Sequence, residues 1–307
     1  MRIAVVGAGG VGGGFGAALA KAGADVTFIA RGAHLAAMQN QGLKVQGGRG
    51  ETHVVPTQAT DDPASIGAVD IVLFCVKLWD VESAGQAIKP LIGPNTAVIP
   101  LQNGIDAAER LIPILGAKAV MGGVAQISAS IVAPGVIQQV GTFMRMIFGE
   151  FDGTRSKRAE DFYALCLKAG FDATLSETIL TELWMKFILL AANAGVMALA
   201  RQPTGKVRDD PDMRAVMVAA YREIVDVGRA SGVRLPPGAL DKVLDFLGHA
   251  PPAMRPSMAI DLDRGNRLEL PWLSGKVVEL GRKLGVPTPT HGMIYAMLKP
   301  YIMGKSA

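Results

Sequence analysis

The stretch Arg2-Ile-Ala-Val-Val-Gly-Ala-Gly-Gly-Val-Gly12 decides the fold of the first half of the chain. Its first part, residues 2–6, is a short apolar run with β-branched side chains, which is typical of a buried parallel strand. Residues 17–22 favour a helix that Gly23 ends, and residues 25–30 form a second strand-like run. The order strand, glycine turn, helix, strand is the setting in which such glycines bind a dinucleotide.

The six residues of the turn fit the pattern G-x-G-x-x-G. The first glycine allows the tight turn, the second lets the backbone approach a pyrophosphate, and the third lets the helix pack near the strand. The helix N-terminus adds unpaired N–H groups and a partial positive charge. A tight turn without a ligand is the alternative, and the context favours cofactor binding. The predicted binding residues are Gly7, Ala8, Gly9, Gly10, Val11 and Gly12.

Arg31 follows the second strand, where a dinucleotide-binding fold meets the adenosine ribose. An acidic residue there would bind the ribose 2′-hydroxyl of NAD, but the nearest acid, Asp25, lies at the start of the strand. A guanidinium can pair with a 2′-phosphate, so Arg31 predicts NADPH as the cofactor. A solvated arginine at a strand end is the less favoured alternative.

Composition limits the function classes. The chain has 307 residues, half of them apolar, which indicates a globular protein of two domains. The formal net charge is +4 and no long basic run occurs, so no nucleic-acid partner is expected. Two isolated cysteines, Cys75 and Cys166, fit a reducing cytoplasm. The four histidines have no metal-ligand spacing, and no metal site is predicted.

No signal peptide and no membrane partner are expected. Met1 leads directly into the first strand. The longest apolar run, residues 187–200, is short for a membrane span and contains Asn193, so it is predicted to be a buried helix. A cytoplasmic enzyme is the expected class. The apolar content is high enough for a homodimer interface.

Two polar residues follow further buried strands. Lys77 comes after the run at residues 69–76, and Asn103 comes after the run at residues 96–101. Ligands of open α/β sheets bind outside the carboxyl ends of the strands, which is where both side chains are expected. A solvated lysine and an Asn-Gly turn are the alternatives, and neither residue alone decides between them.

Almost everything after residue 176 has helical periodicity, and no Pro/Ser-rich linker occurs there. We therefore predict an α/β domain over residues 1–176 and an all-helical domain over residues 177–307. The first helix of the second domain is expected to begin near Ser176 and to carry Lys186 into an apolar run. A surface pair between Glu182 and Lys186 is one interpretation of that lysine. An ammonium at the rim of a buried pocket is the other.

At this point the sequence resembles the ketopantoate (2-dehydropantoate) 2-reductase family over nearly its whole length. The motifs are Gly7-Ala8-Gly9-Gly10-Val11-Gly12, Val76-Lys77-Leu78-Trp79, Gln102-Asn103-Gly104, Glu182-Leu183-Trp184-Met185-Lys186, Ser257-Met258 and Arg267-Leu268-Glu269. The resemblance implies an N-terminal Rossmann domain, an all-helical C-terminal domain and a cleft between them. It also implies NADPH-dependent reduction of a 2-keto acid to a 2-hydroxy acid, such as 2-dehydropantoate to pantoate in pantothenate and coenzyme A biosynthesis.

The resemblance also implies residue roles. Lys186 would be the catalytic lysine with Glu269 as its acidic companion, and Ser257 would contact substrate. Asn103 would lie at the active site, and Lys77 and Arg31 would serve cofactor binding or the cleft. An ammonium at Lys186 could stabilise the alkoxide that forms during hydride transfer and deliver a proton to it, while a carboxylate nearby would keep that ammonium charged.

Three positions depart from the pattern of family members that act on ketopantoate. Those members tend to carry asparagines one and two turns after the lysine, where this chain has Leu190 and Ala194, with an asparagine displaced to Asn193. A further asparagine before the serine is replaced by Met254. Because a buried polar group without a partner costs about 1–3 kcal/mol, a substrate hydroxyl would be penalised here. A different 2-keto acid, contacted through Asn103, Ser257 and Asn193, is the resulting hypothesis.

Two other function classes stay open. One is an NADP(H)-binding regulatory protein without turnover, which would not need Lys186, Ser257 and Glu269 together. The other is an opine- or imine-type dehydrogenase of the same architecture, which amine co-substrates would reveal.

Overall fold

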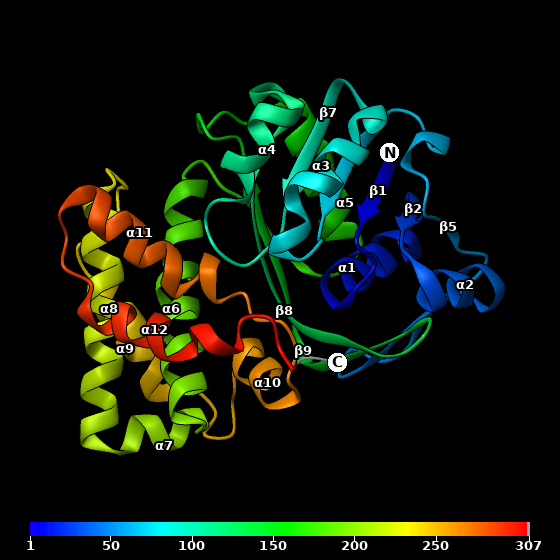
Figure 1. The fold of residues 1–307 in the computed structure, drawn as a ribbon. Coiled ribbons are helices and arrows are strands. Elements are labelled where there is room, and N and C mark those ends of the chain that lie inside the picture. The colour runs from blue at the N-terminus through cyan, green and yellow to red at the C-terminus, as the bar shows by residue number, and fades with distance from the viewer. Residues whose placement is uncertain (306–307) are drawn as a thin grey trace. The chain divides into compact units, whose positions relative to one another are not determined.

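The computed structural model describes residues 1–305, which divide by internal contacts into two compact units. The first unit comprises Met1–Gln102 and Asp106–Ile179. The second comprises Asn103–Ile105 and the chain from Leu180 onward. Most of their helices and strands are labelled in Figure 1.

A five-stranded parallel sheet in the order β5-β2-β1-β6-β7 forms the centre of the first unit. Its strands are β1 (Arg2–Val6), β2 (Asp25–Ile29), β5 (Gln58–Thr60), β6 (Val69–Phe74) and β7 (Ile92–Pro100). Side chains alternate between the two faces, as the two-residue period of a strand requires. On one face, Ala4 and Val6 belong to a core cluster with side chains of α3 (Val81–Ala87) and α4 (Ala107–Leu115).

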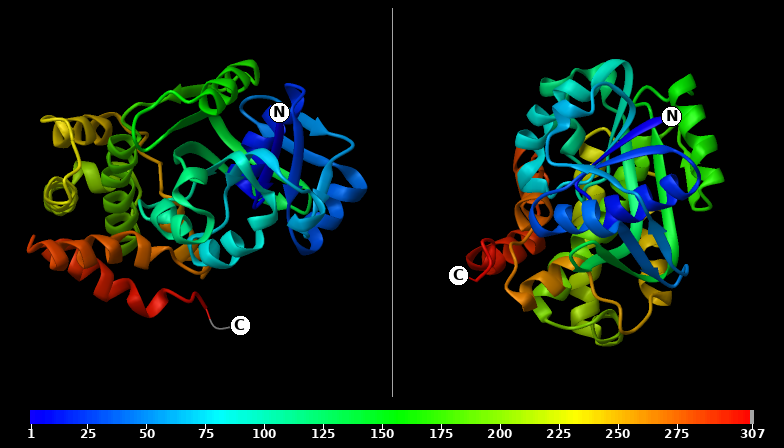
Figure 2. Two further views of the ribbon diagram at one scale, coloured as in Figure 1. Left: turned by 90° about the horizontal axis from the view of Figure 1, so that it is seen from above. Right: turned by 90° about the vertical axis from the view of Figure 1, so that its right-hand side faces the viewer.

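The opposite face of that sheet packs on α1 (Gly10–Lys21), which also contacts a second sheet. The second sheet has the order β10-β9-β3-β4, with β8 paired to β9. Its strands are β3 (Leu43–Gly47), β4 (Thr52–Val54), β8 (Gly122–Ala133), β9 (Val136–Gly149) and β10 (Asp172–Leu175). The helices α2 (Gly32–Gln41) and α5 (Lys157–Lys168) complete the unit, which Figure 2 shows from two further sides.

Close approach of the second sheet explains why α1 is rich in glycine. A Cβ built on Gly10 would overlap the carbonyl oxygen of Ala129 on β8, and one on Gly13 would overlap the side chain of Ile137 on β9. Glycine inside a helix is unfavourable by about 0.5–1 kcal/mol relative to alanine. The helix tolerates this because only glycine leaves room for the β8–β9 hairpin.

The second unit is helical. Its α-helices are α6 (Ile179–Ala200), α7 (Thr204–Asp209), α8 (Pro211–Ala230), α9 (Ala239–His249), α10 (Ser257–Arg264), α11 (Ser274–Leu284) and α12 (Pro289–Leu298). The core around α6 includes Phe187, Ile188 and Tyr221, each at most 1% exposed. α6 is long and apolar enough to cross a membrane, but 67% of its most apolar window is buried inside the protein, as in the core helix of a globular domain.

The predicted fold class is confirmed, and the expected start of the first helix of the second unit needs correction. The helix expected from Ser176 begins at Ile179, and the Ser176 hydroxyl accepts a hydrogen bond from the Thr178 N–H at 3.1 Å. Near the C-terminal end of the chain, Leu273 separates the 3₁₀ turn Leu270–Trp272 from α11.

Candidate functional site

The glycine turn lies at the carboxyl end of β1, beside the end of β6. From β1 the chain first adds β2 and β5 on one side of the sheet, and it then adds β6 and β7 on the other side of β1. The strand order therefore reverses at β1, and open α/β sheets bind ligands at such a position. Gly7 has φ +92°, and a Cβ on it would lie 3.0 Å from the carbonyl carbon of Cys75. Both the backbone conformation and the neighbouring strand therefore require glycine at this position.

Gly9 is glycine for a different reason. Its φ is −73°, which any residue can adopt, and no atom lies within 4 Å of a Cβ built on it. It is the N-cap of α1, and no side chain caps the first-turn amides of that helix. An open cradle in front of unpaired helix amides fits a diphosphate group, and a Cβ would fill that cradle.

Arg31 is the N-cap of α2 and is exposed at the end of β2. No hydrogen bond or ion pair engages its guanidinium within residues 1–305, so it is available to a ligand phosphate. Lys77 is also exposed, at the carboxyl end of β6, with its ammonium 5.6 Å from the centre of the Trp79 ring. The structure therefore brings the predicted cofactor residues of the first unit to one edge of the sheet.

Gln102 and Asn103 follow β7 but belong to different units. The buried Gln102 amide donates to the carbonyl oxygens of Phe74 at 2.9 Å and Val76 at 3.1 Å, which fixes the end of β6. The Asn103 amide instead donates to Oε2 of Glu269 at 3.1 Å, inside the second unit. The motif Gln102-Asn103 thus combines a structural residue with a residue of the candidate site.

Lys186 and Glu269 form the charged centre of the second unit. Lys186 is half-buried on α6, and Glu269 is only 7% exposed where the 3₁₀ turn Leu270–Trp272 begins. Burial lowers the pKa of Lys186 from 10.5 to about 8, and the negative charge of Glu269 opposes this shift. A lysine with a pKa near neutrality can both hold a proton and release it to a reacting oxygen.

Ser257 and Asn193 lie elsewhere in the same unit. Ser257 is exposed as the first residue of α10. Asn193 is buried on α6, and its Oδ1 accepts a hydrogen bond from the hydroxyl of Tyr221 at 2.5 Å. In the described part of the chain, neither residue hydrogen-bonds to Lys186, Glu269 or Asn103. Tyr221 and its bond to Asn193 were not predicted, because one tyrosine in an apolar helical stretch gives no signal of its own.

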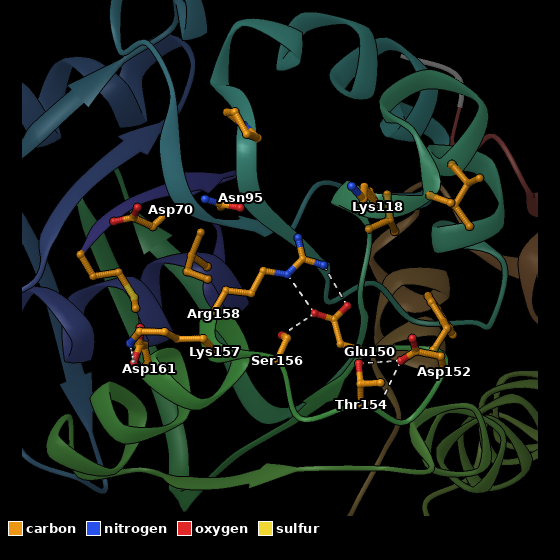
Figure 3. Close-up of a pocket in the computed structure, with 17 residues that line it drawn as sticks. Asp70, Asn95, Lys118, Glu150, Asp152, Thr154, Ser156, Lys157, Arg158 and Asp161 are labelled. Carbon is orange, nitrogen blue, oxygen red and sulfur yellow. Dashed lines mark hydrogen bonds and ion pairs between the residues drawn. The ribbon is translucent and has the colours of Figure 1, made fainter.

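A separate groove lies at the amino ends of the strands of the first unit (Figure 3). Several of its charged groups pair with one another: Arg158 donates to both carboxylate oxygens of Glu150 at 2.8 and 2.9 Å, and Lys157 pairs with Asp161 at 2.7 Å. Asp152 accepts from both the N–H and the hydroxyl of Thr154. The pair Glu150–Arg158 joins the end of β9 to α5, so these two charges have a structural role.

Comparison with known proteins decides the family. The model described as "Ketopantoate reductase PanE/ApbA" matches residues 3–153, and the one described as "Ketopantoate reductase PanE/ApbA C terminal" matches residues 178–301. A 2-dehydropantoate 2-reductase of Mesorhizobium japonicum is 31% identical over 97% of each chain. The chain belongs to the ketopantoate reductase family. The resemblance inferred from the motifs is confirmed, and the protein is an oxidoreductase.

Solved structures of the family agree with this fold. The PanE/ApbA family ketopantoate reductase from Ralstonia eutropha is 30% identical, with a TM-score of 0.89 and 98% of each chain covered. A D-mandelate dehydrogenase solved with NADH and anilino(oxo)acetate is 20% identical, with a TM-score of 0.88 and 98% of each chain covered. At that identity the second likeness concerns the fold alone.

Proposed function

We propose that this protein is an NADPH-dependent reductase of a 2-oxo acid, with Lys186 as the proton donor. The observation that carries the proposal is the half-buried Lys186, whose pKa of about 8 reflects burial opposed by the charge of Glu269. Membership of the ketopantoate reductase family supports the reaction class.

The residues of the first unit would hold the cofactor. The unpaired amides at the start of α1 would bind the pyrophosphate, and Arg31 would pair with the 2′-phosphate. Lys77 would add positive charge at the same sheet edge. When bound, NADPH supplies the hydride, and the remaining steps depend on side chains of this chain.

The residues of the second unit would handle the proton. As negative charge develops on the substrate ketone oxygen, the Lys186 ammonium would donate a hydrogen bond and then its proton to that oxygen. Glu269 would keep the ammonium protonated, and Asn103 would hold the Glu269 carboxylate through the 3.1 Å bond. Ser257 would donate to the substrate carboxylate. Asn193 would contact the substrate through its amide N–H groups, because its Oδ1 already accepts a hydrogen bond from Tyr221. We also propose that the NADP-binding domain comprises residues 1–176 and the helical catalytic domain residues 177–307.

The substrate would be a 2-oxo acid with a less polar side chain than ketopantoate. One turn beyond Lys186, α6 presents the half-buried Leu190, and Ala194 is buried in the following turn. Met254 contributes its carbonyl to Thr204, at 2.9 Å from the hydroxyl, and its side chain is apolar. These positions offer no side-chain donor or acceptor to a substrate hydroxyl, which would lose hydrogen bonds made in water.

The test is a steady-state panel of 2-oxo acids with NADPH and with NADH, using wild type and Arg31→Ala. We expect wild type to prefer NADPH, with the highest kcat/KM for a 2-oxo acid that has an apolar side chain. Arg31→Ala should reduce the NADPH preference about tenfold or more, because the 2′-phosphate loses a charged partner. A wild type that prefers NADH would contradict the cofactor, and ketopantoate ranking first would contradict the apolar substrate.

A further inference from the structure

His34 connects two turns of the first unit through its two ring nitrogens. Nε2 lies 2.9 Å from the carbonyl oxygen of Ala8, inside the glycine turn. The N–H of Gly135, in the turn between β8 and β9, donates to Nδ1 at 3.0 Å. Because a backbone N–H can only donate, Nδ1 is the acceptor, and the neutral ring carries its proton on Nε2 and donates it to Ala8. The half-buried ring therefore joins the glycine turn to the β8–β9 hairpin.

His34 also lies in the same helix terminus as Arg31. His34 and Arg31 lie one turn apart at the start of α2, with Arg31 as its N-cap. A Cβ on Gly135 would be 3.1 Å from the Cβ of Ala37, so the hairpin turn packs directly on α2. Within this packed group of turn, hairpin and helix, His34 is the side chain whose hydrogen bonds reach both turns.

The geometry points to His34 as a positioning residue that holds Arg31 and the glycine turn at a fixed separation. This inference rests on the proposed binding of NADPH, whose 2′-phosphate and pyrophosphate would occupy these two places. A ligand that spans two subsites gains from the second contact only where their separation matches the ligand. Loss of the His34 bonds should therefore weaken ligands that carry both groups more than ligands without the 2′-phosphate.

The experiment measures dissociation constants for NADPH, NADH and 2′,5′-ADP by titration, with wild type, His34→Phe and His34→Gln. We expect His34→Phe to raise the Kd of NADPH about tenfold and that of NADH by less than about threefold. The Kd of 2′,5′-ADP, which carries the 2′-phosphate but only one phosphate of the pyrophosphate, should rise by an intermediate factor. His34→Gln, whose amide offers both an acceptor and a donor, should restore most of the loss. The value of kcat at saturating NADPH should stay within about twofold of wild type, because His34 does not touch reacting atoms.

His53→Phe is the matched control. His53 also bonds a backbone carbonyl through Nε2, at 2.8 Å from the oxygen of Gln41, but at the other end of α2 and away from the glycine turn. Its replacement should leave all three constants unchanged. His34→Asn is measured alongside in case His34→Phe folds poorly, and its shorter amide should give a smaller change of the same kind.

Two results would overturn the inference: an unchanged ratio of the NADPH and NADH constants in His34→Phe and His34→Asn, or the same change of that ratio in His53→Phe. A wild type without preference for NADPH would instead contradict the proposed function. The two failures are therefore distinguishable.

Discussion

The glycine turn of the first unit and the Lys186 region of the second are suited to their proposed roles by opposite features. At the turn, side chains are missing: Gly9 leaves open space before uncapped helix amides. Around Lys186, a half-buried ammonium and the buried Glu269 carboxylate lie beside an apolar helical core, and burial lowers the pKa of the lysine. The shape of the glycine turn is determined by the backbone and its neighbours. The pKa of Lys186, by contrast, is determined by desolvation and by a nearby charge, and such a shift can serve a reaction. The two regions should therefore respond differently to substitution.

The largest effect is expected from Lys186→Ala, which removes the proposed proton donor. The value of kcat should fall about 10²–10⁴-fold, the range typical of general acid catalysis. The Kd of NADPH, measured by fluorescence titration, should change by less than about twofold. Lys283→Ala, an exposed lysine of α11, is the control. Undiminished turnover would show that Lys186 is not the proton donor, and the Lys186 region would then have no catalytic role to compare with the glycine turn.

A second buried titratable group, His291, should make the helical unit sensitive to acid. Burial lowers its pKa from 6.5 to about 4, although the charge of Glu223 opposes the shift. Because the unfolded chain takes up this proton at a higher pH than the folded chain, the contribution to stability is complete above about pH 6.5. It is lost as the pH falls towards 4, by up to about 3 kcal/mol.

The measurement is the free energy of unfolding of wild type and His291→Gln between pH 7 and pH 4. The variant should lose less stability over this range, because its side chain does not titrate. His249→Gln, at an exposed position of α9, should follow the wild-type curve. Parallel curves for wild type and His291→Gln would show that the buried imidazole has no part in the acid response.

The glycine turn should show a smaller effect, on binding and not on stability. In Gly9→Ala the added methyl meets no protein atom, so the Tm should stay within about 2–4 °C of wild type, which corresponds to less than about 1 kcal/mol. The KM for NADPH should rise about tenfold or more, because the methyl fills the space proposed for the pyrophosphate. Gly248→Ala, where a Cβ also meets nothing, should leave the KM unchanged. An unchanged KM in Gly9→Ala would mean that the turn binds no diphosphate.

The smallest expected effect is a shift of a pH profile. Reduction requires a protonated Lys186, so kcat should fall as the pH rises above about 8. The charge of Glu269 raises the pKa of Lys186, so Glu269→Gln should move this alkaline limb to lower pH, by about one unit. Glu279→Gln, an exposed carboxylate of α11, should not move it. A limb that stays in place would separate Glu269 from the proton donor.

The sequence predicted those parts of the molecule that depend on local patterns. The first strand, the glycine turn and the parallel strands β6 and β7 follow from apolar runs bounded by glycine and proline. Lys186 was predicted as a site residue because charge is rare in an apolar helix. The role of Glu269 was predicted from the family resemblance.

Other parts could not be predicted because they depend on contacts distant in sequence. The residues of β8 beyond Ile127 are mostly exposed, so they lack a buried strand pattern, and their pairing with β9 defines them. The role of His34 depends on Ala8 and Gly135, which lie 26 and 101 residues away. The short strand β10 is defined by its parallel pairing with β9.

The second unit is encoded in two separate places of the gene, because it contains Asn103–Ile105 as well as the chain from Leu180 onward. A protein expressed from residue 177 onward would contain Lys186 and Glu269 but would lack the amide that donates to Glu269. During translation, Asn103 leaves the ribosome more than 160 residues before its partner, since the two are separated by 166 positions. The helical unit can therefore assemble its charged centre only after nearly the whole chain has been synthesised, and dissecting the protein into separate domains would divide that centre.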